Sequence, residues 1–146
     1  MLCVDVNVLV HLSNKTSNQH ASAKQWLQEA LTSSENIVIP EVVVTGFVRV
    51  VTDRRILAKP LTVEAAFDFL EAILDVPKAT MFATRTRTFP LFKKQSIDLG
   101  LHGKDIADSW IAAIALDLDA SLVTFDRGFR RFPNLRVVNP DDSWNG

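Results

Sequence analysis

Short apolar runs rich in β-branched residues alternate along this chain with longer segments of helical periodicity. This alternation limits the possible folds more than any other feature. The apolar runs are residues 2–6, 35–40, 79–83, 121–125 and 135–138. The segments with helical spacing are residues 18–33, 41–53, 63–75, 88–99 and 104–119. Strands that alternate with helices predict an α/β fold with a mainly parallel central sheet. Ligands of such sheets bind beyond the carboxyl ends of the strands.

One segment, 41–53, fits either kind of element. Its many valines favour a strand. Its apolar residues also form one helical stripe, and Pro40 just before it suits a first helical turn. We therefore expect a helix there.

The chain is the size of one domain, at 146 residues, and no linker, repeat or low-complexity tract divides it. We expect a single domain over residues 1–146. No apolar run approaches the ~20 residues that cross a bilayer, and no basic segment precedes the first apolar run. The one cysteine, Cys3, allows no internal disulfide. These features predict a cytoplasmic protein without membrane association.

Asp5 lies inside the first apolar run, MLCVDVNVLV. A carboxylate among valines must find a partner or shift its pKa upward. Three more acids are predicted to reach the same edge of the sheet. Asp126 directly follows an apolar run, and Asp105 and Asp108 share a face at the start of the segment 104–119. Taken alone, Asp105 could cap its helix and Asp126 could start a turn.

The acids repel one another if they converge. Two carboxylates ~5 Å apart repel by about 3 kcal/mol at an effective dielectric of ~20. Three or four together would have strongly raised pKa values unless a cation neutralised them. Oxygen ligands without His or Cys favour Mg²⁺, or Mn²⁺ as a substitute, over Zn²⁺. We therefore expect Asp5 to be a metal ligand, on the condition that the acids meet as the topology predicts.

Four segments together resemble the PIN-domain family. They are DVNVLV, PEVVVTGFVRVVT, DIADSWIAAIAL and LVTFDRGFRRF. The likeness runs from Leu2 to about Pro140 and is greatest to the VapC-type ribonuclease toxins of bacterial toxin–antitoxin pairs. It implies a small three-layer α/β/α sandwich and Mg²⁺-dependent cleavage of RNA. It also implies a cognate antitoxin protein that inhibits at the site, and a homodimer.

The resemblance assigns catalytic and metal-binding roles to Asp5, Asp108 and Asp126, with Thr124 as the small polar residue before the last acid. Asp105 is an additional acid one turn before Asp108, and it could hold metal or only cap the helix. These acids would hold Mg²⁺ for hydrolysis of a phosphodiester.

The chain departs from the family's pattern at one acid. The family usually has a Glu three residues before the arginine that is Arg49 here, and this chain has Gly46 at that position. Glu41 is a possible substitute, although an acid at a helix start has an equally good structural role.

Several polar residues near the acids have two possible roles. Asn7 could orient a ligand or water, or cap the following helical turn. The Ser109 and Thr124 hydroxyls could support the metal ligands, or simply be satisfied within the fold. The net charge of -1 neither demands nor excludes RNA. Local clusters matter more, and the expected RNA-binding residues are Arg49, Arg127, Arg130 and Arg131.

Two other functions remain open at this point. In a haloacid-dehalogenase-like phosphatase, Asp5 would be a nucleophile that forms an acyl phosphate, since DVNVL approaches the D-x-D motif of those enzymes. Asn7 cannot supply the general acid that this chemistry needs. A non-catalytic PIN-like binding module is the third possibility, if Gly46 marks a site that has lost its activity.

Overall fold

Five strands form one sheet in the computed structural model, which describes residues 1–142. Their order across the sheet is β3-β2-β1-β4-β5. The strands are β1 (Leu2–Val4), β2 (Ile37–Pro40), β3 (Ala79–Phe82), β4 (Ser121–Val123) and β5 (Val137–Val138). Every neighbouring pair is parallel. The prediction of a mainly parallel sheet is confirmed, and all five carboxyl ends lie along one edge.

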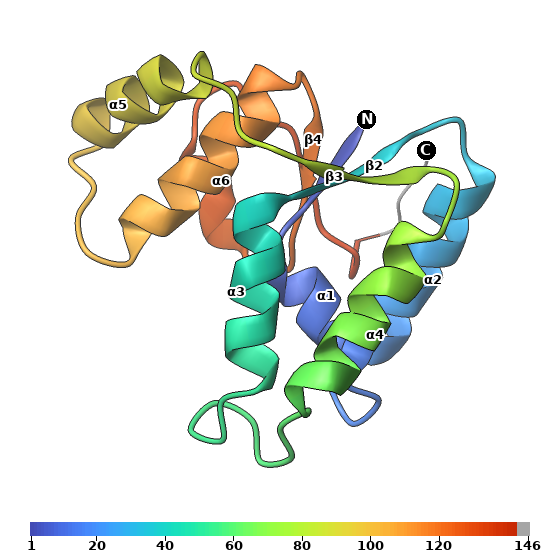
Figure 1. Ribbon diagram of the computed structural model, residues 1–146. Coiled ribbons are helices and arrows are strands. Elements are labelled where there is room, and N and C mark those ends of the chain that lie inside the picture. The colour runs from blue at the N-terminus through green and yellow to red at the C-terminus, as the bar shows by residue number, and fades with distance from the viewer. Residues whose placement is uncertain (143–146) are drawn as a thin grey trace.

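Six α-helices and one 3₁₀ helix connect the strands. They are α1 (Val6–Ser13), α2 (His20–Thr32), α3 (Glu41–Val51), α4 (Val63–Leu74), α5 (Thr88–Asp98), α6 (Asp105–Asp117) and η1 (Arg127–Arg131). The α5–α6 pair lies on the left of the sheet in Figure 1, and α1, α2 and α4 gather on the right. The architecture is a three-layer α/β/α sandwich, and the helix expected over 41–53 is present as α3. Within residues 1–142, no helix has the length and apolar character needed to cross a bilayer.

The helix α6 is held firmly between the sheet and α5. Ala112, Ala113 and Ala115 are fully buried, and their small side chains allow the helix to approach its neighbours closely. On the other side, the buried Ser109 hydroxyl bonds to the side chains of Gln95 and Ser96 of α5. Ser109 therefore fastens α6 to α5 and does not support the acids. This packing sets the direction in which the first turns of α6 project.

The helices α1 and α3 make a close approach at Gly46. A Cβ atom built on Gly46 would lie 2.8 Å from Cγ2 of Val6. That separation is too short for two carbon atoms, so glycine is what lets these helices come together here. Because Val6 directly follows Asp5, this contact also positions the start of α1.

We predict that Gly46→Ala and Val6→Ala are strongly coupled. The better helix propensity of alanine alone would stabilise α3 by about 1 kcal/mol, and the clash with Val6 costs about 1–3 kcal/mol. Gly46→Ala should therefore be less favourable in the native background than in the Val6→Ala background, by about 1–2 kcal/mol. Urea unfolding of the two single variants and the double variant measures this coupling. Additive effects, within about 0.5 kcal/mol, would contradict the close approach.

Candidate active site

Asp5 is the residue that joins β1 to α1. It lies just past the strand, at the N-cap of α1, and not inside the strand as the sequence suggested. Its side chain remains only 5% exposed. The Oδ1 atom accepts a hydrogen bond from the backbone N–H of Val6 at 2.7 Å. The start of a helix therefore supplies part of the stabilisation that a buried carboxylate requires.

Thr124 and Asn7 hold the other oxygen of Asp5. The Thr124 hydroxyl and the Asn7 amide each donate to Asp5 Oδ2 at 2.7 Å. Asn7 also donates to Thr124 Oγ1 at 2.9 Å, and its Oδ1 accepts from the backbone N–H of Phe125 at 3.1 Å. Asn7 therefore orients a site residue and does not cap the helix. All these donors are neutral, so the charge of Asp5 is hydrogen-bonded but is not neutralised.

Asp126 begins the 3₁₀ helix that follows β4. Its backbone N–H donates to Thr124 Oγ1 at 3.0 Å, and its Oδ1 accepts from the backbone N–H of Gly128 at 2.7 Å. The Thr124 hydroxyl therefore connects two of the predicted acids, Asp5 and Asp126. Asp126 thus does start a turn, which was the structural role considered for it, and its Oδ2 is not engaged in that contact.

The pKa values show that three acids act on one another. Burial raises the pKa of Asp5 to about 6, and the charges of Asp108 and Asp126 add to that rise. The hydrogen bonds from Thr124 and Val6 oppose it. Burial also raises the pKa of Asp108; the Arg131 charge opposes this rise, and the charges of Asp126 and Asp105 add to it. The structure thus brings Asp5, Asp108 and Asp126 to one end of the sheet, as the topology predicted.

Arg131 lies against the acids of α6. Its Nη2 donates to Asp108 Oδ2 at 3.0 Å and lies 3.4 Å from Asp105 Oδ1. Within residues 1–142, no three His, Cys, Asp or Glu side chains form a group compact enough to hold a metal ion as they stand. The donor set suits a hard cation, since it consists of carboxylates. Asp108 Oδ1 and Asp126 Oδ2 accept no hydrogen bond from the described residues, whereas both oxygens of Asp5 already accept from neutral donors. The metal-binding role of these acids therefore stays a prediction. The guanidinium of Arg131 occupies part of the space beside Asp108 and Asp105 that a bound ion would need.

The residues considered in place of the missing family acid do not join this cluster. Glu41 is exposed at the start of α3, where its Oε1 accepts from the backbone N–H of Thr84 at 3.2 Å. This contact ties α3 to the loop after β3, which favours a structural role. Any side chain at Gly46 would meet Val6 first. An acid cannot be introduced there unless the Val6 side chain or the start of α1 shifts.

The predicted RNA-binding arginines do not form one surface. Arg127 and Arg130 both pair with Asp142, at 3.3 and 3.2 Å. Arg131 pairs with acids of α6 instead. Arg49 is exposed on α3 and acts on Asp53, whose pKa is lowered mainly by its hydrogen bonds to Arg55 and to a small degree by the Arg49 charge. Three of the four arginines thus lie on η1, and Arg49 stands apart from them.

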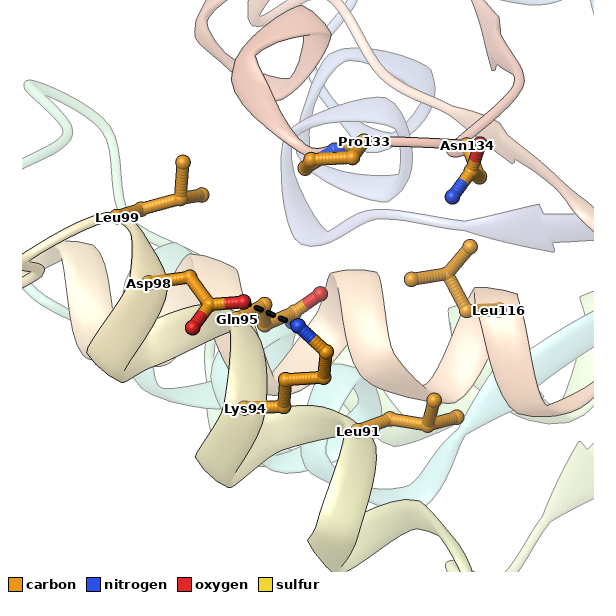
Figure 2. Close-up of a pocket in the computed structure, with 8 residues that line it drawn as sticks. All are labelled: Leu91, Lys94, Gln95, Asp98, Leu99, Leu116, Pro133 and Asn134. Carbon is orange, nitrogen blue, oxygen red and sulfur yellow. Dashed lines mark hydrogen bonds and ion pairs between the residues drawn. The ribbon is translucent and has the colours of Figure 1, made fainter.

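A cavity of about 250 Å³ lies between α5, α6 and the loop after η1. Figure 2 shows Leu91, Leu99 and Leu116 pointing into it, with the Lys94–Asp98 ion pair on its α5 side. Its lining contains none of the predicted site residues. The cavity is therefore separate from the acids, which lie at the carboxyl edge of the sheet.

A comparison with protein families agrees with this geometry. The PIN domain profile matches residues 2–135, which is most of the chain. The chain belongs to the PIN-domain family. Its curated relatives include a VapC ribonuclease of Mycobacterium bovis, 37% identical over 142 residues and covering 97% of both chains. Ribonuclease VapC25 of Mycobacterium tuberculosis is 29% identical over 140 residues, which cover 96% of this chain and 99% of that one.

Solved structures show the same fold at low sequence identity. VapBC2 of Rickettsia felis, bound to a DNA fragment from its promoter, has a TM-score of 0.74 at 21% identity, covering 94% of this chain and 97% of that chain. VapC20 of Mycobacterium tuberculosis, a toxin that cleaves the sarcin–ricin loop, has a TM-score of 0.69 at 14% identity over 93% and 99%. The resemblance and the α/β/α sandwich predicted from the sequence are confirmed. The haloacid-dehalogenase-like alternative loses its basis.

We predict that Asp5 makes the metal-free protein less stable as the pH rises from about 4 to about 6. The folded pKa of about 6 lies above the unfolded value near 3.8, so folding favours the protonated form. The stabilisation is complete below about pH 4 and is lost by about pH 6. A shift of about two units corresponds to about 3 kcal/mol. We would measure the unfolding free energies of the native protein and of Asp5→Asn in EDTA from pH 4 to 7. Over this range the native protein should lose about 3 kcal/mol of stability relative to the variant. Parallel pH profiles would contradict it.

Proposed function

We propose that this protein is a Mg²⁺-dependent endoribonuclease and the toxin of a type II toxin–antitoxin pair. One observation carries the proposal: Asp5 is buried, its charge is not neutralised, and two more acids at the same strand ends raise its pKa. The cap that Asp5 gives α1 offsets only part of the cost, since a buried charge without a counter-ion is expensive. A cation bound to the acids accounts for its presence. VapC relatives of nearly the same length, named as ribonucleases, support RNA as the substrate.

The donor set fits the proposed metal. Asp5, Asp108 and Asp126 would hold Mg²⁺, with Asp105 as a further carboxylate near Asp108. Mn²⁺ could take the same oxygen ligands. When bound, the ion lowers the pKa of a water and offsets the charge that develops on the phosphodiester.

The protein's own residues prepare the site for this chemistry. Asn7 and Thr124 fix both the position and the orientation of the Asp5 carboxylate through neutral donors, which leaves its full charge for a cation. Thr124 also fixes the backbone of Asp126. The arginines of η1 lie directly after Asp126 and supply positive charge for RNA phosphates that approach the acids.

The proposed partners follow from the relatives and the structural neighbours. Several of the neighbours are toxin–antitoxin complexes, two of them VapBC complexes bound to DNA. We propose that this chain has a cognate antitoxin protein that covers the acids. We also propose a homodimer and a cytoplasmic location, where RNA and an antitoxin would both be available.

We predict that Asp5→Asn and Asp108→Asn abolish Mg²⁺-dependent cleavage of single-stranded RNA while the protein stays folded. Each substitution removes one proposed ligand and one repelling charge together. Cleavage by the purified protein is measured on gels with Mg²⁺ and with EDTA. Asp119→Asn is the matched control, because Asp119 is an exposed acid that pairs with Arg136, and its positive φ of 49° suits asparagine.

The control variant should cleave as well as the native protein does. Native-level cleavage by Asp5→Asn or Asp108→Asn would show that the acid concerned is not a ligand. RNA binding without cleavage by the native protein under every metal condition would favour the non-catalytic binding module instead.

We predict that Arg127 and Arg130 contribute to RNA affinity through phosphate contacts. Each phosphate contact contributes about -0.7 to the slope of log K against log salt for a single strand. The Arg127→Gln/Arg130→Gln double variant should therefore flatten the slope by roughly one unit and weaken binding similarly for different RNA sequences. Fluorescence anisotropy in EDTA measures this without cleavage. An unchanged slope in the folded double variant would exclude these arginines from the RNA path.

A further inference from the structure

The guanidinium of Arg131 stands at the acidic end of α6. A single nitrogen, Nη2, lies 3.0 Å from Asp108 Oδ2 and 3.4 Å from Asp105 Oδ1. The three side chains are partly open to solvent, with exposed fractions of 35% for Arg131, 33% for Asp108 and 27% for Asp105. One cationic group therefore offsets the repulsion between two acids that lie one helical turn apart.

The position of Arg131 is set by the same short helix that positions Asp126. Asp126 is the N-cap of η1, and Arg131 is its last residue. The Arg131 guanidinium also lies over the ring of Phe132, 5.1 Å from its centre, and that ring is 2% exposed. The buried ring supports the arginine on one side while the acids of α6 hold it on the other.

A divalent cation and this guanidinium compete for the same carboxylate. Asp108 is a proposed ligand, and its Oδ2 already accepts from Arg131. A bound ion with two positive charges would neutralise Asp108 more completely and would repel the guanidinium. Partly exposed ion pairs contribute little free energy each, so breaking the contacts of Arg131 costs little.

We propose that Arg131 is the resident counter-ion of Asp105 and Asp108, that a divalent cation displaces it, and that the released guanidinium binds an RNA phosphate beside the acids. The proposal rests on the metal-dependent function proposed above and adds a role for Arg131 in it. Metal loading and RNA binding then favour one another, because the same event creates the cation site and frees a phosphate-binding group.

The first test measures the binding of Mn²⁺ alone by titration calorimetry. Arg131→Gln should bind Mn²⁺ roughly threefold to tenfold more tightly than the native protein, which corresponds to the loss of one or two partly exposed ion pairs. Arg130→Gln is the matched control. It removes the same charge from the same helix, but the arginine that it replaces pairs with Asp142 and not with the acids of α6. It should change the affinity by less than about twofold.

Each result of the titration has a definite meaning. Equal affinities of Arg131→Gln and Arg130→Gln, or weaker binding by Arg131→Gln, would overturn the proposal while the metal-dependent function stands. If native protein, Arg131→Gln and Arg130→Gln all fail to bind Mn²⁺, the proposed metal-dependent function fails and this inference fails with it. Binding by Arg131→Gln alone would support the competition.

The second test measures affinity for a 2′-O-methyl single strand of mixed sequence, with Mg²⁺ and with EDTA, and checks the strand for integrity afterwards. Mg²⁺ should increase the affinity of the native protein and of Arg136→Gln, a control in which the replaced arginine pairs with Asp119 outside the proposed RNA path. The increase should be at least threefold smaller in Arg131→Gln. The same increase in all three proteins would overturn the phosphate-binding role.

A measurement on the native protein covers the case in which Arg131→Gln does not fold. The arginine side chains are observed by nitrogen-15 magnetic resonance during a Mg²⁺ titration, and Arg131→Lys identifies the Arg131 signal by its loss. The Arg131 guanidinium should become more mobile as Mg²⁺ binds. An Arg131 signal that keeps its position and mobility at saturating Mg²⁺ would overturn the displacement.

Discussion

The buried hydrogen bonds among Asp5, Asn7 and Thr124 are the interaction on which the site depends. They join the carboxyl ends of β1 and β4, which are neighbours in the sheet, and they involve side chains 119 residues apart at most in sequence. Every donor in the group is neutral. A lysine or arginine at position 7 or 124 would neutralise Asp5 and remove the charge that the proposed cation requires. The neutral donors Asn7 and Thr124 orient the carboxylate and leave that charge available.

The second half of the site is positioned mainly by the packing of α6, in addition to the hydrogen bond that Arg131 donates to Asp108. Asp105 and Asp108 project from the first turns of α6, and the rest of that helix is buried between the sheet and α5. The contact of Ser109 with Gln95 fixes the rotation of the helix about its axis. Substitutions at the α5–α6 contact should therefore alter the site without touching a carboxylate, because they change where the first turns of α6 point.

The sequence predicted the architecture well because its two periodicities are distinct. Each strand is a short apolar run, and each predicted helix has an apolar stripe, so the α/β order could be deduced. The same pattern placed Asp126 just after a strand and Asp108 at the start of a helix. The sequence could not show what surrounds Asp5. Its partners are Asn7, two residues away, and Thr124, on a distant strand. A hydrogen-bonding side chain remote in sequence carries no periodic signal, and the pairing appears only when the register of β1 with β4 is known.

The sequence also could not show which acids the arginines after Asp126 pair with. In the sequence, Arg127, Arg130 and Arg131 look like one basic cluster that follows Asp126, and proximity in sequence suggested a common role. In the structure, Arg127 and Arg130 face Asp142, whereas Arg131 faces α6. The turn of η1 separates them, since residues three apart in a 3₁₀ helix share a face and adjacent residues do not. Each of these arginines is thus paired with an acid, so their positive charge is largely offset locally. If RNA binds at this edge as proposed, each of these arginines must exchange an existing ion pair for a phosphate contact. A change that frees an arginine would then raise RNA affinity without adding any positive charge.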